Sequence, residues 1–467
     1  MPKLNDICFC EAKANSGDEF VGIRCVKSND GKYETRIDFP LGYFKGDIAI
    51  RESTEDAVRE NVMNLFSVLS DVDLMSKVRE DSSIAAMSEE MKTTAYPMLA
   101  YLNVIRSYFD NGYITEKEVE YKKKAHGKVN WNRTIKMTRP VVTDDDENLV
   151  YLDLIARKVS YNEDCLITLV HKFCVHDALK RLGFLFGIEP TEEPILDFDY
   201  ELFCSAINAK LSKTFNDRDL HLLSDLAKII EFLAEHQTED GINSEFTFGV
   251  NKFAPMWEAM VDRIFATVSR EEKRNKYNPH LKFVAFGSAN TDGEKYQDDD
   301  NEGTDEEHKR STLRPDTIMQ NGENIFILDS KYYKYGLKGN LCFLPGADSV
   351  CKQMAYAEYV ERNAVRFGVL NELDNVGEHV FNAFVLPYCV EADNRKLPPD
   401  ADSETRPFKM RYAGYIYGDW KQVPDVQHPY HKIACILLDV KSVMQNYVAS
   451  GTERQILANL ITSNTKG

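Results

Sequence analysis

The feature that most constrains the fold is a short apolar run that ends in charged residues. Residues 325–328 read IFIL and are followed directly by Asp329, a serine and Lys331. A run this short, rich in branched and aromatic residues, predicts a buried strand. Asp316, in an Arg-Pro-Asp triplet separated from Asp329 by twelve residues, begins a second predicted strand, and the polar turn at 320–324 joins the two as a hairpin. The hairpin brings Asp316, Asp329 and Lys331 to one end of a sheet.

Two carboxylates and a lysine at one sheet end are suited to a defined kind of chemistry. Asp329 and Lys331 are two residues apart, so both side chains point to the same face of the strand. Carboxylate oxygens prefer a hard cation such as Mg²⁺, and a neighbouring ammonium group can hold a water molecule or stabilise a pentavalent phosphorane. The pattern therefore indicates metal-assisted hydrolysis of phosphodiester bonds.

Three further residues are candidates for this site, each with a structural alternative. Glu258 stands in the first turn of a predicted helix, where it could reach the metal or its water, or simply favour the helix dipole as a surface residue. Gln353 and Tyr356 share one face of the helix predicted after the strand. They are candidate substrate-binding residues for a phosphate or a terminal base, or else part of a half-buried amphipathic helix.

Length and charge limit the class of protein. A chain of 467 residues predicts two or three domains, and we place a boundary near 240–250. The fold class is α/β (α+β): residues 1–240 form a mixed amino-terminal region, with short strands in 1–50 and mainly helices afterwards, and 245–467 form the second domain. A net charge of −18 argues against loose binding of nucleic acid over the whole surface, but leaves room for a local basic groove.

The sequence also predicts the compartment. No stretch approaches the roughly 20 apolar residues needed to span a bilayer, and Asp6 and Glu11 interrupt the start where a signal peptide needs an apolar core. The ten scattered cysteines agree with a cytoplasmic protein. His171, Cys174 and His176 are interpreted as part of a packed helix, because structural zinc sites need four well-spaced ligands.

Two charged stretches lie outside the hairpin. The basic stretch at 122–136 contains Lys128, Trp131 and Arg133, which could contact DNA phosphates or a partner's nucleotide site, or could lie on a solvated hairpin. Residues 292–307 are strongly acidic and are interpreted as a solvated loop, with a decoy for DNA phosphates as the alternative.

The order of these motifs resembles the PD-(D/E)XK nuclease superfamily. More narrowly, it resembles the LlaJI-type restriction endonucleases, relatives of McrC, the nuclease subunit of McrBC systems. The resemblance is carried by Glu258, RPD at 314–316, ILDSKYY at 327–333, KQMAY at 352–356 and FVLP at 384–387, with weaker support from FPLGY at 39–43 and GKVNWNRTI at 127–135.

The resemblance implies a fold and a set of roles. It implies a central mixed sheet flanked by helices in the carboxy-terminal domain. Asp316 and Asp329 become ligands of Mg²⁺, for which Mn²⁺ can substitute, Lys331 becomes the water-orienting base, and Glu258 an accessory acid. The implied substrate is DNA, cut as part of a restriction system that defends against phage.

The resemblance also implies a partner. McrC-like proteins work with a separate McrB-like AAA+ GTPase or ATPase ring, and this sequence has no Gly-x-x-x-x-Gly-Lys-Ser/Thr loop of its own. Residues 1–240 are then expected to face that partner or DNA. Two alternatives stay open: a regulatory protein that docks on such a ring without cutting, and a stand-alone restriction enzyme that reads its own site.

Overall fold

The computed structural model describes most of the chain. The described residues are 4, 7–12, 19–28, 33–45, 54–71, 73–75, 96–123, 127–142, 149–162, 164–238, 241–242, 244–279, 313–366, 368, 375–390, 409–419 and 428–465. The acidic stretch at 292–307, the strand expected at 281–287 and the acidic turn expected at 144–147 lie outside them.

The chain divides into two compact units that are not contiguous in sequence. Unit 1 contains residues 1–7, 25–35 and 95–247, and unit 2 contains residues 8–24, 36–94 and 248–467. The second unit thus includes amino-terminal segments together with the carboxy-terminal half. A functional division into a partner-docking or DNA-contacting region at 1–240 and a nuclease domain at 245–467 stays a prediction.

Unit 2 is built on a five-stranded mixed sheet in the order β12-β13-β14-β16-β15. Its inner pairs, β13 with β14 and β14 with β16, are parallel, and its two outer pairs are antiparallel. The strands are β12 (Thr317–Asn321), β13 (Asn324–Ser330), β14 (Val380–Tyr388), β15 (Met410–Ile416) and β16 (Ile433–Asp439).

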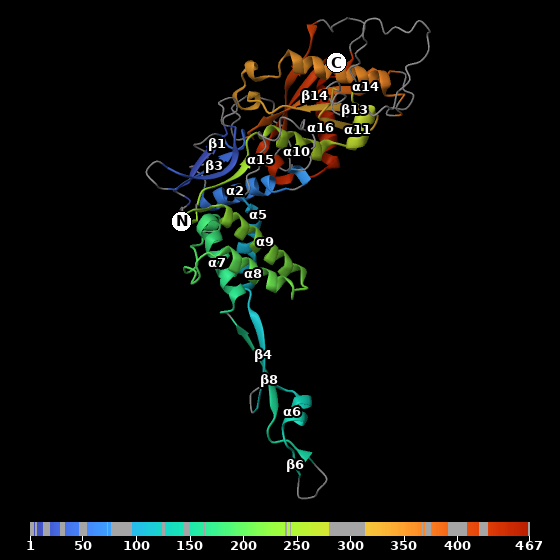
Figure 1. Ribbon diagram of the computed structural model, residues 1–467. Coiled ribbons are helices and arrows are strands. Elements are labelled where there is room, and N and C mark those ends of the chain that lie inside the picture. Colours follow the sequence, from blue (N-terminus) through green and yellow to red (C-terminus); the bar gives the residue numbers. More distant parts are fainter. Residues whose placement is uncertain are drawn as a thin grey trace, which may run out of the picture. The chain divides into compact units, whose positions relative to one another are not determined.

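Helices cover this sheet. All residues of β14 and β16 are buried, as expected of central parallel strands with both faces packed. Contacts to the sheet come from α10 (Ala254–Phe265), α14 (Ala347–Asn363) and α16 (Gly451–Thr465) (Figure 1). The fold class predicted for the carboxy-terminal domain, a mixed sheet flanked by helices, is confirmed.

The remaining elements of unit 2 are short or amino-terminal. A four-stranded sheet has the order β1-β3-β2-β11, and its strands β2, β3 and β11 each contain residues of both units. The bounds are β1 (Cys8–Glu11), β2 (Val21–Lys27), β3 (Tyr33–Phe39), β11 (Phe246–Val250), α2 (Glu55–Leu69), α11 (Arg270–Lys276), α13 (Tyr335–Lys338) and α15 (Val440–Asn446).

Unit 1 consists of a helical bundle and a long antiparallel ribbon. The bundle packs α5 (Met98–Asn111), α7 (Leu166–Leu182), α8 (Tyr200–Leu211) and α9 (Asp217–Glu235). The stretch at 197–240, expected as helical, holds two helices because Asn216 caps a new start by accepting from Arg218 N–H. His171, Cys174 and His176 all lie in α7, as expected.

We call the ribbon and its end the arm. Strand β4 (Glu116–Lys123) pairs along its whole length with β8 (Ile155–Asn162), and the ribbon leads from the bundle to β5 (Lys128–Val129) and α6 (Trp131–Met137) (Figure 1). The small pair β6 (Val141–Val142) and β7 (Leu149–Val150) follows, and a separate pair joins β9 (Gln237–Thr238) to β10 (Gly241–Ile242). Strand β8 runs to Asn162, and α7 begins at Leu166.

None of the helices within the described ranges is long and apolar enough to cross a membrane.

Candidate active site

The predicted hairpin forms and brings its charged residues together. Strands β12 and β13 pair antiparallel from Thr317 opposite Leu328 to Asn321 opposite Asn324. Asp316 therefore stands just before β12, at the same end of the hairpin as Asp329 near the end of β13. The Asp316 carboxylate accepts the Ser330 backbone N–H at 2.9 Å, which fixes the two strand ends against each other.

Lys331 completes this cluster. Its Nζ lies 3.0 Å from one carboxylate oxygen of Asp329 and 2.9 Å from the other. Its backbone N–H donates to the Val385 carbonyl on β14 at 3.0 Å, so the residue continues the line of the strand after β13 ends at Ser330. Asp329 is only 6% exposed, and this pairing with a cation is what makes a buried carboxylate tolerable.

The charges in the cluster shift one another's pKa values. Burial, and then the neighbouring Asp329 and Glu258 carboxylates, raise the pKa of Asp316 well above its usual range. Burial opposes the charge of Lys331, but Asp329 and Asp316 outweigh it and raise the pKa of the lysine above its ordinary value. Lys331 is therefore a permanent cation. Glu258, on α10, contributes to the raised pKa of both Asp316 and Lys331.

Gln353 and Tyr356 lie beneath the cluster, on α14. Gln353 is fully buried, and its amide donates to the Ile327 carbonyl at 2.7 Å and to Asn382 at 3.3 Å. Tyr356 donates to the Arg314 carbonyl at 3.0 Å. Burial, followed by the charges of Asp329 and Asp316, raises the pKa of Tyr356 to about 12. In this structure both residues contact protein, and their contact with substrate stays a prediction.

Two residues at the site escaped the sequence analysis. Lys273, on α11, donates from Nζ to the Asp316 carbonyl at 2.5 Å. Tyr332, directly after Lys331, is partly buried, and its hydroxyl accepts the Leu41 backbone N–H at 2.5 Å. The sequence of α11 does not indicate that Lys273 contacts Asp316. The sequence shows the two tyrosines after Lys331, but it does not indicate that Leu41 is the partner of Tyr332.

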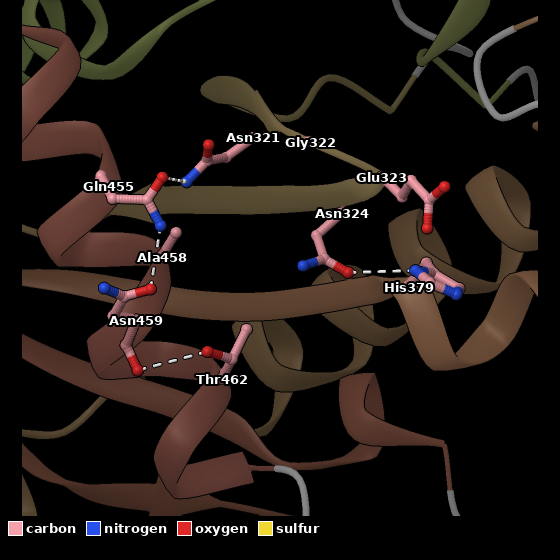
Figure 2. Close-up of a pocket in the computed structure, with 9 residues that line it drawn as sticks. All are labelled: Asn321, Gly322, Glu323, Asn324, His379, Gln455, Ala458, Asn459 and Thr462. Carbon is pink, nitrogen blue, oxygen red and sulfur yellow. Dashed lines mark hydrogen bonds between the residues drawn. The ribbon is translucent and has the colours of Figure 1, made fainter.

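A polar pocket occupies the opposite end of the same hairpin. It has a volume of about 320 Å³ and is lined by the turn between β12 and β13, by α16 and by His379 (Figure 2). Its amides bind one another: Asn321 donates to Gln455 at 3.1 Å, and Gln455 donates to Asn459 at 2.9 Å. The pocket is thus separated from the acidic cluster by the full length of both strands.

The predicted contact residues Lys128, Trp131 and Arg133 all lie on the arm. Lys128 is exposed, Trp131 is 57% exposed, and the Arg133 guanidinium stacks 3.7 Å from the centre of the Tyr121 ring. Thr134 anchors α6 to the ribbon by accepting the Ile155 N–H at 3.0 Å. Lys128 and Trp131 are therefore exposed on the arm, whereas the Arg133 side chain packs against the ribbon through Tyr121.

The sequence model of the LlaJI restriction endonuclease family matches residues 47–397. The chain belongs to this family. The resemblance drawn from the motifs is thereby confirmed, and the match covers Glu258, the whole hairpin and α14 as well as the arm. Family membership makes the cluster at Asp316, Asp329 and Lys331 the candidate active site of a restriction endonuclease.

Individual relatives are more distant. The chain is 24% identical over 266 residues to the type II restriction enzyme BsuMI component YdjA of Bacillus subtilis (strain 168), an alignment that covers 54% of this chain and 52% of that protein. The chain thus spans about half the length of this curated relative.

One solved structure is similar over most of the chain. Its title describes a refined half-complex from a tetradecameric assembly of Thermococcus gammatolerans McrB AAA+ hexamers with bound McrC. The match covers 94% of this chain and 82% of the other at 14% identity, with a TM-score of 0.31. A TM-score this low supports no argument about the fold or partners of this family member.

Proposed function

We propose that this chain is the Mg²⁺-dependent DNA-cutting subunit of a restriction system, and that it hydrolyses phosphodiester bonds at the cluster of Asp316, Asp329 and Lys331. One observation carries the proposal. The two carboxylates and the ammonium group, predicted from sequence as a catalytic set, lie within bonding distance at the end of the β12–β13 hairpin.

The donor set fits a magnesium ion. Among the described residues, no group of three or more His, Cys, Asp or Glu side chains is placed to hold a metal. Mg²⁺ needs fewer, because it is usually bound by one or two carboxylates and completes its shell with waters and substrate phosphates. Asp316 and Asp329 would hold the ion. Their crowding supports this, since the raised pKa of Asp316 marks a place where added positive charge is favourable.

The protein's own residues would then act on the phosphodiester. A bound Mg²⁺ supplies a Lewis acid and eases deprotonation of a water molecule. Lys331 would orient that water and offset the negative charge that develops on the phosphoryl oxygens as the water oxygen bonds to phosphorus and the bond to the leaving sugar oxygen breaks. The raised pKa of Lys331 favours this cationic role over the role of base. Glu258, whose charge acts on Asp316 and Lys331, would assist in accepting the proton of the water, and the leaving oxygen would take a proton from solvent.

We propose that the arm docks on a nucleotide-driven ring partner of the McrB-like AAA+ type. Large apolar side chains on the arm are exposed where a monomer would normally bury them: Trp131 (57%), Ile135 (56%), Met137 (65%), Leu149 (61%) and Leu152 (70%). Several exposed apolar side chains on one extended element are a feature of protein-binding surfaces. Lys128 and Arg133 beside it would reach the partner's nucleotide site or DNA phosphates.

The test is a cleavage assay with supercoiled plasmid and Mg²⁺, with and without the candidate ring protein and GTP or ATP. We expect cutting that requires Mg²⁺ and increases with the ring and its nucleotide. Asp329→Ala should abolish cutting, and the matched control Asp348→Asn, an exposed acidic residue on α14, should cut as the wild type does.

The same assay separates the alternatives. Site-specific cutting by the chain alone would favour a stand-alone restriction enzyme. Faster nucleotide turnover by the ring without any cutting would favour a regulatory protein with an inactive nuclease fold.

A further inference from the structure

We propose that Tyr332 is a positioning residue for Lys331, and that the segment at 39–43 (FPLGY) is the part of the chain that holds Tyr332 in place. The inference rests on the proposed function. It assigns a role to the amino-terminal FPLGY motif, which has no part in the catalytic cluster itself. The motif would support the nuclease site through Tyr332.

Tyr332 touches both sides of the active site. It follows Lys331 directly, so a contact that holds its side chain in place also restrains the backbone next to the lysine. Its ring packs against Phe253 and Trp257, with centroids 5.6 Å and 6.4 Å away. Trp257 immediately precedes Glu258 on α10. One partly buried aromatic side chain therefore connects the segments that carry the catalytic lysine and the accessory acid.

The hydroxyl of Tyr332 is fixed by the amino-terminal segment. It accepts the backbone N–H of Leu41 at 2.5 Å, a contact between residues 291 positions apart. Burial raises the pKa of Tyr332 well above its usual value, so the hydroxyl stays protonated. The hydroxyl is bound to the protein backbone at Leu41, so we expect it to act on catalysis through its neighbours and not by contact with DNA.

The segment at 39–43 is itself held rigidly within unit 2. Gly42 donates its N–H to the Glu11 carboxylate at 2.6 Å and has a φ of +85°, which strongly favours glycine. A Cβ there would lie 3.2 Å from Leu337 and 3.3 Å from Val440, so the backbone is packed closely against neighbouring helices.

The aromatic residue that ends the segment anchors it. The Tyr43 hydroxyl donates to Asn61 at 3.0 Å and accepts from Asn64 at 3.0 Å, both on α2. Its ring stacks on Phe39 with centroids 5.1 Å apart. Leu41 thus presents its N–H from a loop with both ends fixed, which is what a positioning contact requires.

The first test compares two neighbouring tyrosines. Tyr332→Phe removes only the hydroxyl, and Tyr333→Phe makes the same change at the next residue, which is 39% exposed. We expect Tyr332→Phe to lower the single-turnover cleavage rate about tenfold, because small displacements of catalytic groups are costly. Affinity for duplex DNA, measured with Ca²⁺ in place of Mg²⁺, should stay unchanged, and Tyr333→Phe should match the wild type in both.

The split between rate and affinity distinguishes positioning from general destabilisation. A structural defect alone would lower the melting temperature and the active fraction, but not the rate per active molecule well below the melting temperature. Wild-type cleavage by Tyr332→Phe, or an equal loss in Tyr333→Phe, would overturn the inference.

The second test asks whether the segment and the tyrosine act through one contact. Gly42→Ala should lower the cleavage rate. Gly368→Ala, at a φ of +62° and with no atom of the described residues within 4 Å of the added Cβ, imposes a similar backbone strain and should not lower it. In the double variant Gly42→Ala/Tyr332→Phe the losses should not add, as expected for residues that share an interaction. Additive losses would show that the two residues act independently.

Hydrogen–deuterium exchange decides the inference even if the wild-type chain proves unable to cut DNA. That result would contradict the proposed function. The positioning contact would still be supported if Tyr332→Phe sped exchange in peptides covering both 39–44 and 326–334, with no change in the Tyr333→Phe protein. Faster exchange confined to 39–44 would show that the contact does not reach Lys331, and would refute the inference.

Discussion

The five-stranded sheet of unit 2 and the arm of unit 1 place polar and apolar side chains in opposite ways. At the end of β13, Asp329 is almost completely buried and is paired with Lys331. On the arm, Trp131 and Met137 are more than half exposed on a helix that is firmly attached to its ribbon. Unit 2 thus buries charged groups and the arm exposes apolar groups, both of which are unusual in a folded protein.

This difference in burial suggests a different role for each region. Buried like charges cost free energy and persist where chemistry needs them, because a bound cation and a substrate phosphate can repay the cost. Exposed aromatic and aliphatic groups cost nothing comparable in a monomer, but they invite association. We therefore expect changes in unit 2 to alter cutting under all conditions, and changes on the arm to alter only what a partner adds.

The largest effect should come from Lys331→Ala. Loss of the cation beside Asp329 removes charge stabilisation of the phosphorane, and loss of a single such donor lowers turnover about 10²–10³-fold in other enzymes. Cleavage of plasmid DNA should fall by at least that factor with and without the ring partner. The exposed Lys352→Ala on α14 is the control. Cutting by Lys331→Ala at a rate near that of the wild type would contradict the catalytic assignment.

Asp316→Asn should separate activity from stability. The amide cannot supply the charge that a cation needs, so cleavage should be lost as in Asp329→Ala. The same change removes one of the carboxylates that repel one another at this site, so the melting temperature in EDTA should rise by about 2–4 °C, equivalent to roughly 1 kcal/mol in a unit of this size. A lower melting temperature would mean that the carboxylate's bond to the Ser330 N–H outweighs the repulsion.

The arm should respond to Lys128→Ala combined with Arg133→Ala. We expect partner-stimulated cleavage and nucleotide turnover to fall roughly tenfold, in the range of interface residues of moderate importance, while cleavage by the chain alone stays the same. Lys213→Ala, an exposed lysine of the helical bundle, serves as the control. If stimulated turnover and cleavage are both unchanged, the docking role of these residues is wrong.

Much of unit 2 was predictable because its signals are local. The apolar run of β13 predicts a buried strand that ends at charged residues, and short sequence separation brings Asp316 to the same end of the hairpin. The contacts that were missed are non-local. The sequence near Tyr332 does not indicate that its hydroxyl binds the Leu41 N–H. No periodicity in the sequence assigns residues 36–94 to the same unit as the five-stranded sheet.

The arm was only partly predictable for a different reason. The β4 segment, EKEVEYKK, is charged on both faces, so it lacks the alternation that indicates a half-buried strand. It becomes a strand because it pairs with β8 along its full length, which no local pattern reveals. Gln353 illustrates a third limit: its position on the helix was correct, but the sequence cannot say that its amide binds the carbonyl of Ile327.

The smallest expected effect concerns His171, an ionisable group that unit 1 buries in α7. Its Nδ1 accepts the Ile114 backbone N–H at 3.1 Å, and its Nε2 has no hydrogen-bond partner among the described residues. Burial lowers the pKa of His171 from 6.5 to about 4. The folded state therefore keeps the ring neutral, while the unfolded chain takes up a proton once the pH falls below about 6.5.

This contrast with the paired charges of unit 2 gives a pH dependence with a defined sign. The contribution of the neutral ring to stability is fully present above pH 6.5 and is lost progressively as the pH falls toward 4. Between pH 7 and pH 5.5, wild-type unit 1 should lose about 1 kcal/mol more than His171→Gln, whose side chain does not titrate. Urea unfolding at both pH values, followed by a signal from unit 1, measures the difference. His221→Gln, at an exposed position on α9, should behave as the wild type does. An equal loss of stability in His171→Gln would show that the ring is not kept neutral by burial.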